Sequence, residues 1–279
     1  MAKKKYNPND SIWAMGLDHE LKYGIDENGD EILVKSTNSG DEQVMMEWEI
    51  PYMKALIEEL NPKGDVLEIG FGLGYSATFI QEHKPKSHTI IECHPTVIKE
   101  AKVWAKDYPD SDIRIIEGPW QDTLETLGVF DEIFLDDHGL DIKKKDKYDG
   151  TYKSYMLPYL MKENHYIFFD MVLNHHMKKG SKLTYYQNSP WEKYGYAGQF
   201  NHSKNAKEYW RSNYESPRYY SQIVNNPLTE YWEKIISLPN PASPTCNYFF
   251  GPEAIIAMTT KIYDDENEII NEQNELNGE

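Results

Sequence analysis

The chain has 279 residues, with 29 basic and 46 acidic side chains and a formal charge of −17 at pH 7. Its 39% hydrophobic and 13% aromatic residues are typical of a globular protein rather than a disordered one. A pI near 5.0 argues against broad electrostatic binding to nucleic acid or to an anionic membrane. Two cysteines, Cys93 and Cys246, exclude a disulfide framework, and no apolar run reaches the length of about 18 residues that spans a membrane. The N-terminus shows no apolar signal segment, so we expect a cytoplasmic protein of enzyme size.

Residues 1–41 read as an irregular N-terminal leader that we expect to form a lid, with Trp13 as its one large apolar anchor. Residues 42–60 then place apolar side chains at helical spacing, which predicts a helix. Pro51 interrupts that spacing and predicts either a kink or a fresh helix start.

Strand-like and helix-like segments alternate after residue 64. The expected strands cover residues 65–69, 89–92, 113–117, 130–136 and 166–171, and the expected helices cover residues 75–83, 95–107, 119–127 and 152–162. Strands separated by single helices indicate right-handed crossovers and a parallel sheet with helices on both faces. In such a doubly wound α/β fold, ligands bind at the carboxyl ends of the strands.

The last hundred residues break this alternation. Residues 178–230 form an aromatic-rich insertion, and residues 231–238, 246–250 and 254–262 read as closing strands, expected to be antiparallel. Residues 263–279 are an acidic tail with seven carboxylates and no base, which we expect to be solvated. The prediction is therefore a mostly parallel seven-stranded sheet in a domain of residues 42–262.

A glycine loop follows the first strand of this sheet, in the run V-L-E-I-G-F-G-L-G at residues 66–74. Glycines at positions 70, 72 and 74 allow positive φ and a close approach of a ligand, and the loop opens a helix whose N-terminal amides face that ligand. The dinucleotide pattern G-x-G-x-x-G requires glycine where Tyr75 stands, so this loop favours a different cofactor. The alternative is a glycine turn that binds no ligand.

Three further strand ends carry side chains suited to a nucleoside and to chemistry. Glu92 ends the second strand 18 residues after Gly74, a spacing that suits a carboxylate on ribose hydroxyls, although an exposed strand-end glutamate is the alternative. Trp120 is expected to flank an adenine ring or to lie in the core, and Gln121 to bond the edge of the ring. Asp136 and Asp137 end the fourth strand, where the reacting group of a cofactor would be delivered. The alternatives to a catalytic role are a loop cap or a surface acid pair.

As a set, these segments resemble one family. V-M-M-E-W-E-I-P-Y-M at residues 44–53, the glycine loop, I-I-E-C at 90–93, G-P-W-Q-D at 118–122, residues 130–136 and C-N-Y-F-F at 246–250 resemble the guanidinoacetate N-methyltransferases in order and spacing. The first segment, Gly72-Leu73-Gly74 and Trp120-Gln121-Asp122 look equally like fungal protein arginine delta-N-methyltransferases. The resemblance covers roughly residues 42–172 and 231–262.

The resemblance implies a class I methyltransferase that uses S-adenosyl-L-methionine and releases S-adenosyl-L-homocysteine. It assigns Glu49 and Asp136 to the guanidino group, and Trp13 to a lid. The expected cofactor contacts are Met45, Met53, Glu68, Gly70, Phe71, Gly72, Leu73, Gly74, Tyr75, Ser76, Glu92, Cys93, Trp120, Gln121 and Asp136. No metal site is expected, because His175, His176 and His202 have no partner at ligand spacing.

The chemistry of the acceptor agrees with two carboxylates. A guanidinium is a planar cation whose forked donors suit carboxylates, and it becomes a nucleophile only as one nitrogen loses a proton. Asp136 is therefore assigned as base and clamp, and Glu49 as the second clamp.

The substrate stays open at this stage. In the guanidinoacetate enzymes a loop after the fifth strand binds the substrate carboxylate, and the matching place here contains Asp170, whose charge would repel it. We therefore expect another small guanidino or amine compound. The alternatives are arginine in a protein, a non-catalytic protein that binds S-adenosyl-L-methionine, and a NAD-dependent oxidoreductase; the oligomeric state is open.

Overall fold

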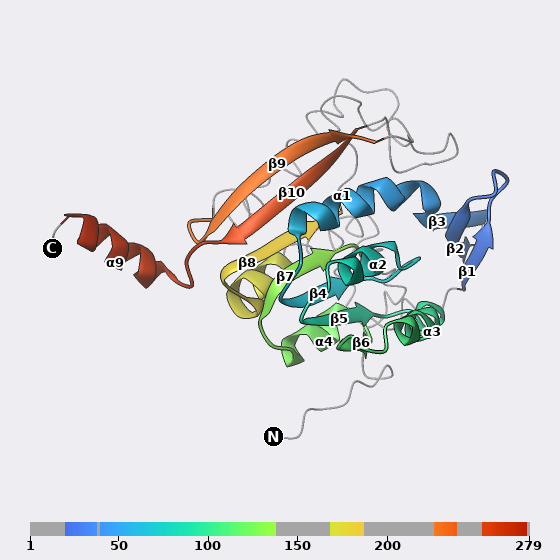
Figure 1. Cartoon of the computed structure of the whole chain (residues 1–279), viewed down its shortest axis with the longest axis horizontal. Helices are drawn as coiled ribbons and strands as arrows, with labels where there is room; N and C mark the ends of the chain where they lie inside the picture. The colour runs from blue at the N-terminus through green and yellow to red at the C-terminus, as the bar shows by residue number, and fades with distance from the viewer. Residues whose placement is uncertain (1–19, 38–39, 138–167, 187–225, 239–252, 278–279) are drawn as a thin grey trace, which may run out of the picture.

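A seven-stranded sheet forms the centre of the computed structural model, which describes residues 20–37, 40–137, 168–186, 226–238 and 253–277 (Figure 1). Its order is β6-β5-β4-β7-β8-β10-β9. The strands are β4 (Asp65–Ile69), β5 (Ser87–Glu92), β6 (Ile113–Glu117), β7 (Phe130–Leu135), β8 (Met177–Tyr185), β9 (Thr229–Ser237) and β10 (Glu253–Lys261). Strands β4 to β8 are parallel, whereas β10 is antiparallel to both β8 and β9. The predicted fold class is confirmed.

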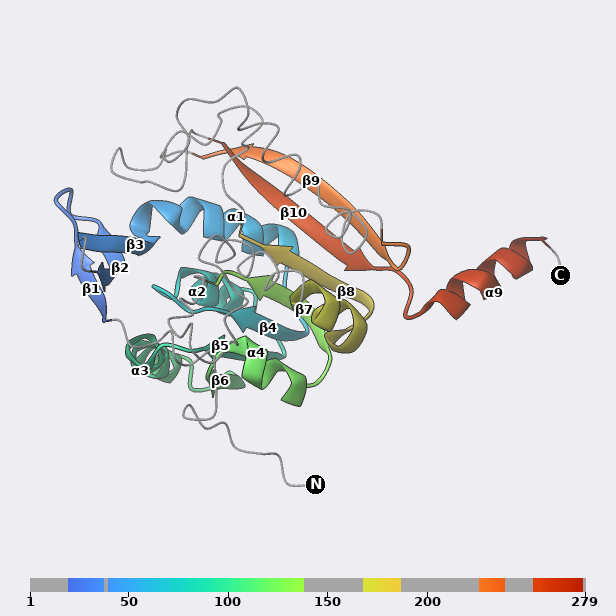
Figure 2. The same ribbon diagram turned by 180° about the vertical axis from the view of Figure 1, so that it is seen from behind.

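Helices cover both faces of this sheet. One face carries α1 (Ile50–Leu60), α2 (Tyr75–Glu82) and α3 (Pro95–Trp104), and the other carries α4 (Trp120–Thr123) (Figures 1 and 2). Helix α1 begins with Pro51 in its first turn, where the missing N–H costs nothing, and ends at Asn61 in the left-handed conformation. Short 3₁₀ turns follow or precede these helices at η2 (Glu47–Glu49), η3 (Ala105–Asp107) and η4 (Leu124–Thr126).

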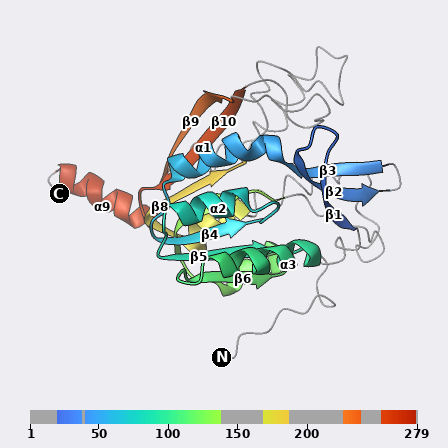
Figure 3. The ribbon, with the colours of Figure 1, turned by 45° about the vertical axis from the view of Figure 1, so that its right-hand side comes forward.

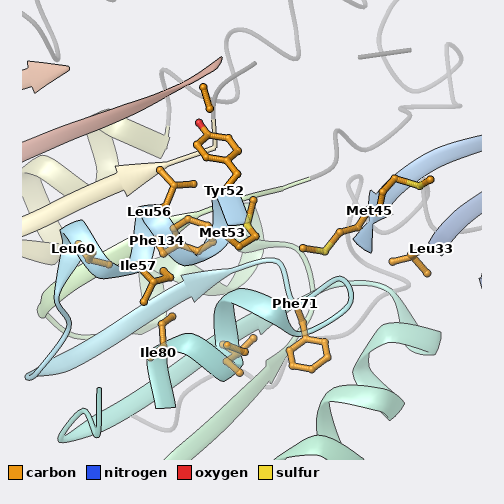
Figure 4. Packing of buried hydrophobic residues seen from close by; sticks show 14 of the residues in the cluster. Leu33, Met45, Tyr52, Met53, Leu56, Ile57, Leu60, Phe71, Ile80 and Phe134 are labelled. Carbon is orange, nitrogen blue, oxygen red and sulfur yellow. The ribbon is translucent and has the colours of Figure 1, made fainter. Parts of the chain in front are cut away.

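Two apolar clusters hold the helices to the sheet. The first joins α1 and α2 to one face of the strands, and Tyr52, Met53, Leu56 and Ile57 of α1 are fully buried in it (Figure 4). The second lies on the opposite face and contains Trp120. Neighbouring residues of β4, β5 and β7 enter opposite clusters, as Ile90 and Ile91 do, so these strands are covered on both faces.

The N-terminal region contains a second sheet, so the expected irregular leader is wrong over residues 20–37 and 40–41, and the expected helix is wrong over residues 42–46. Strands β1 (Leu21–Ile25), β2 (Glu31–Thr37) and β3 (Gly40–Met46) form an antiparallel sheet beside the start of α1 (Figure 3). The turn between β1 and β2 contains Asn28-Gly29, with Gly29 at φ +91°, and the Asp26 carboxylate accepts N–H bonds from Asn28 and Asp30 at 2.8 and 3.0 Å. The fresh helix start at Pro51 is confirmed.

The expected strand over residues 166–171 is also wrong where it is described. Residues 168–171 are helical and lead into a π turn, η6 (Val172–His176). Phe168, Phe169 and Val172 are buried at helical spacing, which a short apolar run does not distinguish from a strand. Strand β8 pairs with β7 instead, so a strand occupies the start of the expected 178–230 insertion.

The acidic tail forms a helix, α9 (Glu266–Asn277), that projects away from the sheet (Figure 1). Lys179 ties it to β8 through an ion pair with Glu268. Several predicted features lie outside the described residues: Trp13, the helix at 152–162, residues 187–225 of the aromatic insertion with His202, and the strand at 246–250. Within the described ranges, no helix is long and apolar enough to cross a membrane.

Candidate active site

The glycine loop is folded so tightly that its three glycines have no room for side chains. Gly70, Gly72 and Gly74 have φ of +85°, +55° and +77°. A Cβ on Gly70 would lie 2.0 Å from the backbone oxygen of Asp136, and one on Gly72 would lie 2.4 Å from the sulfur of Met45. The loop therefore lies directly against the end of β7 and against β3.

A buried polar network supports the loop from below. Ser76 Oγ donates to Glu68 Oε1 at 2.5 Å, and Glu68 Oε2 lies 2.9 Å from Nε2 of His88. Nδ1 of His88 lies 3.0 Å from Nε2 of Gln81. Glu68 and Ser76 were both expected to contact the cofactor, and the structure buries them beneath the loop, where they link β4 to α2.

Glu92 lies at the carboxyl end of β5 beside the loop. Its carboxylate accepts backbone N–H bonds from Phe71, Cys93 and His94 at 3.0, 2.7 and 2.8 Å. Burial raises the pKa of Glu92 above its usual range, and these three donors oppose that rise. Burial and the charges of Glu92 and Asp137 also raise the pKa of the Cys93 thiol.

The structure brings the two predicted catalytic carboxylates together. Asp136 follows β7 and donates its backbone N–H to Ile69 O at 3.0 Å, which fixes it beside the end of β4. Glu49 is 3% exposed, and its Oε1 accepts the N–H of Met46 at 2.8 Å. Burial, followed by the negative charges of Glu49 and Asp137, raises the pKa of Asp136 well above its usual range. This edge therefore favours a bound cation.

Trp120 and Gln121 begin α4 at the same edge. Trp120 is 3% exposed, packs edge-on to Phe168 and donates Nε1–H to Asp137 Oδ2 at 2.9 Å, so it is a core residue that also fixes Asp137. Gln121 Oε1 is buried and makes no hydrogen bond to any residue that the structure describes. It remains available as an acceptor for a ligand donor such as an amino group.

The remaining predicted contacts divide between core and loop. Met53 is fully buried within the first cluster, and the Phe71 ring packs against Trp104 at a centroid distance of 5.4 Å (Figure 4). Met45 reaches the loop, with its sulfur 3.1 Å from Leu73 N. Tyr75 begins α2.

Sequence reasoning missed three residues at this edge. Tyr23 OH donates to Gly72 O at 2.9 Å, and Glu31 Oε2 accepts the Tyr75 hydroxyl at 3.0 Å. Tyr186 follows β8, and its ring lies 5.3 Å from that of Tyr52. The Asn28-Gly29 hairpin turn was the available signal for the sheet that carries Tyr23 and Glu31.

The structure also removes the objection based on Asp170. This residue is exposed, lies in the helix before β8, and accepts a hydrogen bond from Asn174 Nδ2 through its backbone oxygen at 2.9 Å. The loop after the fifth parallel strand starts at Tyr186 and continues outside the described residues. A substrate with a carboxylate is therefore not disfavoured by Asp170.

The residues at this edge fit a nucleoside cofactor. The glycine loop offers backbone donors at the start of α2, Glu92 lies beside it, and Gln121 presents an orphaned acceptor. A crevice of about 450 Å³ lies at the amino ends of β4 and β5, at the opposite edge of the sheet from Asp136.

Known proteins agree with this arrangement. The family model described as guanidinoacetate N-methyltransferase matches residues 35–194, more than half of the chain. Protein arginine N-methyltransferase 2 of Saccharomyces cerevisiae is 38% identical over 136 residues, which is 46% of this chain and 32% of that protein. Its Aspergillus oryzae counterpart is 42% identical over 100 residues, 33% of this chain and 24% of that protein. The chain thus spans a third or less of these relatives.

Solved structures resemble the chain more distantly. An O-methyltransferase from Bacillus cereus in complex with SAH has a TM-score of 0.47 at 16% identity, covering 76% of this chain and 80% of that chain. Spermidine synthase from Thermotoga maritima has a TM-score of 0.48 at 13% identity, covering 88% and 73%.

The extent of the family match, together with the order of the sheet, confirms the predicted family, fold class and enzyme class. S-adenosyl-L-methionine is the cofactor that the resemblance implies, and the residues at the carboxyl edge fit it. The chain belongs to the guanidinoacetate N-methyltransferase family and is an enzyme of the methyltransferase class.

Proposed function

We propose that this protein transfers a methyl group from S-adenosyl-L-methionine to a guanidino nitrogen of a small molecule. The observation that carries the proposal is the meeting of Glu49 and Asp136 at the carboxyl edge, where burial and the charge of Glu49 raise the pKa of Asp136 and a bound cation would favour its ionised form. A guanidinium offers that cation in a planar form that two carboxylates bind through forked hydrogen bonds.

Asp136 acts as the base in this proposal. A carboxylate with a raised pKa binds a proton more readily than one with an ordinary pKa, so Asp136 is suited to accept the proton that the attacking nitrogen loses. Glu49, fixed by the Met46 N–H, orients the other side of the guanidinium. Holding the nitrogen in line with the methyl group contributes to the rate by pre-orienting the reactants.

The cofactor is held in this proposal by residues already placed at the edge. The loop amides bind its charged groups, Glu92 accepts its ribose hydroxyls, and Gln121 Oε1 accepts its amino group. When bound, S-adenosyl-L-methionine supplies an electrophilic methyl group on a sulfonium centre. That residues 1–41 form a lid and that residues 178–230 select the substrate remain predictions, as does a cytoplasmic location.

Arginine in a protein is the second candidate acceptor. The names of the curated relatives favour it, and an acidic surface suits basic protein substrates. The chemistry at Asp136 is the same for a free guanidine and for an arginine side chain.

A mass-spectrometric screen tests the proposal. Purified protein and S-adenosyl-L-methionine are incubated with guanidino compounds, amines and arginine-containing peptides, and products are searched for a gain of one methyl group. We expect methylation of a guanidino nitrogen that is lost in Asp136→Asn. Methylation of amines or hydroxyls alone, or of no acceptor in any class, would overturn the proposal.

A further inference from the structure

One peptide group of the glycine loop is held at both of its polar atoms by the N-terminal sheet. The hydroxyl of Tyr23 on β1 donates to Gly72 O at 2.9 Å. The next nitrogen, Leu73 N, lies 3.1 Å from the sulfur of Met45 on β3. This carbonyl and this N–H belong to the same peptide plane, so rotating the plane would break both contacts.

The peptide group between Gly72 and Leu73 could rotate if nothing restrained it. Gly72 has φ +55°, and glycine passes between backbone conformations more easily than any other residue. Gly70 is confined by the backbone of Asp136, whereas what surrounds Gly72 is the flexible side chain of Met45. The orientation of the 72–73 peptide also sets the start of α2, whose amides face the cofactor.

The N-terminal sheet is itself fixed to the same loop. Glu31 on β2 accepts the hydroxyl of Tyr75, and the N–H of Glu31 donates to Glu47 Oε2 at 2.6 Å. Burial, and then the charges of Glu92 and Glu100, raise the pKa of Tyr23 above its ordinary value. The phenol therefore keeps its proton, and can donate to Gly72, at any pH the protein meets.

We propose that Tyr23 is a positioning residue for cofactor binding, whose hydroxyl holds the 72–73 peptide in the orientation that the cofactor requires. The proposal rests on the proposed function only in its choice of cofactor, and it involves no acceptor. Removal of the hydroxyl allows the peptide to rotate before binding, and this should lower affinity without changing the chemical step.

Calorimetric titration with S-adenosyl-L-homocysteine tests this with Tyr23→Phe. Since a neutral hydrogen bond contributes about 0.5–1.5 kcal/mol, we expect a dissociation constant about 2- to 10-fold higher than that of the wild type. In turnover, KM for S-adenosyl-L-methionine should rise by a similar factor while kcat at saturation stays unchanged. Amide hydrogen exchange at Leu73 should become faster.

Tyr263→Phe is the matched control, because it removes a tyrosine hydroxyl bonded to Glu272 of α9, the helix that lies at the opposite end of the molecule from β1 (Figures 1 and 3). It should leave the dissociation constant unchanged. Met45→Leu, which removes the sulfur but keeps the bulk, should weaken binding as Tyr23→Phe does and guards against a folding defect in one variant. Unchanged affinity in Tyr23→Phe, whatever the result for Met45→Leu, or a fall in kcat without a change in affinity, would overturn the inference. Absence of binding by the wild type would instead count against the proposed function.

Discussion

Two acidic regions lie at opposite ends of this protein and behave differently. At the carboxyl edge of the sheet, burial and the charge of Glu49 raise the pKa of Asp136 well above its usual range. On the projecting helix α9, a hydrogen bond from Lys179 lowers the pKa of Glu268, whose side chain is 34% exposed. Both regions contribute to the same net charge of −17, so the total charge does not distinguish them.

The difference is one of solvation. Water stabilises the charge of an exposed carboxylate, and dissolved salt screens its attraction to a nearby lysine. Such a charge therefore contributes little to stability or binding. A buried carboxylate without a cation is unstable in its ionised form, and a bound cation relieves that instability. Binding energy for a cationic acceptor is thus concentrated at the buried edge.

Asp136→Asn should have the largest effect. Loss of the base should reduce kcat by about 100- to 10,000-fold. At the same time the unliganded variant should melt at a higher temperature than the wild type at pH 7, because a raised carboxyl pKa means that ionisation above the usual pKa costs the folded state stability. Steady-state assays and thermal melts measure the two effects; a lower melting temperature would contradict the electrostatic explanation.

Gly70→Ala should lower the free energy of unfolding by about 2–4 kcal/mol. The new Cβ would combine a positive φ with a 2.0 Å approach to the Asp136 backbone oxygen, which no side-chain movement can relieve. Gly128→Ala is the control, because nothing lies within 4 Å of its Cβ position. Urea denaturation should show destabilisation in Gly70→Ala only. Equal unfolding midpoints for the two variants would show that the loop backbone relaxes to accommodate the new Cβ.

The burial of His176 should make the stability of the fold depend on pH, at a position away from the candidate active site. Burial lowers the pKa of this ring, whose Nδ1 lies 2.8 Å from Gly128 O, so the unfolded chain binds the proton more readily. The stability that neutral His176 contributes is present above the usual pKa of about 6.5 and is lost as the pH falls toward the lowered one. Melting temperatures of the wild type should therefore fall relative to His176→Gln between pH 7 and pH 5. A constant difference would exclude this linkage.

Glu268→Gln should have the smallest effect. The ion pair with Lys179 is solvent-exposed, and exposed pairs commonly contribute nothing measurable. Neither melting temperature nor turnover should differ from the wild type within error. A loss of turnover would show that α9 takes part in the chemistry.

The sequence predicted the central sheet because its strands are buried on both faces. Strands β4 and β7 place Val66-Leu67 and Ile133-Phe134-Leu135 between charged residues, and these short apolar stretches alternate along the chain with helix-like segments. The strand predicted over residues 166–171 fails because its apolar run Tyr166-Ile167-Phe168-Phe169 fits a buried helix equally well. The N-terminal sheet was missed although Asn28-Gly29 marked its hairpin.

The sequence predicted those residues of the candidate site that lie in recognisable motifs. Glu92 and Asp136 follow parallel strands, so the fold alone brings them to one edge. Tyr23 lies 49 residues from Gly72 along the chain, and no spacing rule connects a strand of one sheet with a loop of another. Trp120 and Ser76 stay predicted cofactor contacts, and their observed burial depends on the packing of neighbours that the sequence does not reveal.

Proton release on acceptor binding tests the central claim most directly. A guanidino compound that the screen identifies as an acceptor is titrated into the complex of the protein with S-adenosyl-L-homocysteine. The titration is done by calorimetry at mildly acidic pH, in two buffers of different ionisation enthalpy. The wild type and Glu268→Gln should release a proton as the guanidinium forces Asp136 to ionise, and Asp136→Asn should release less and bind more weakly. Equal release and equal affinity in all three would contradict the assignment of the buried edge as the cation site.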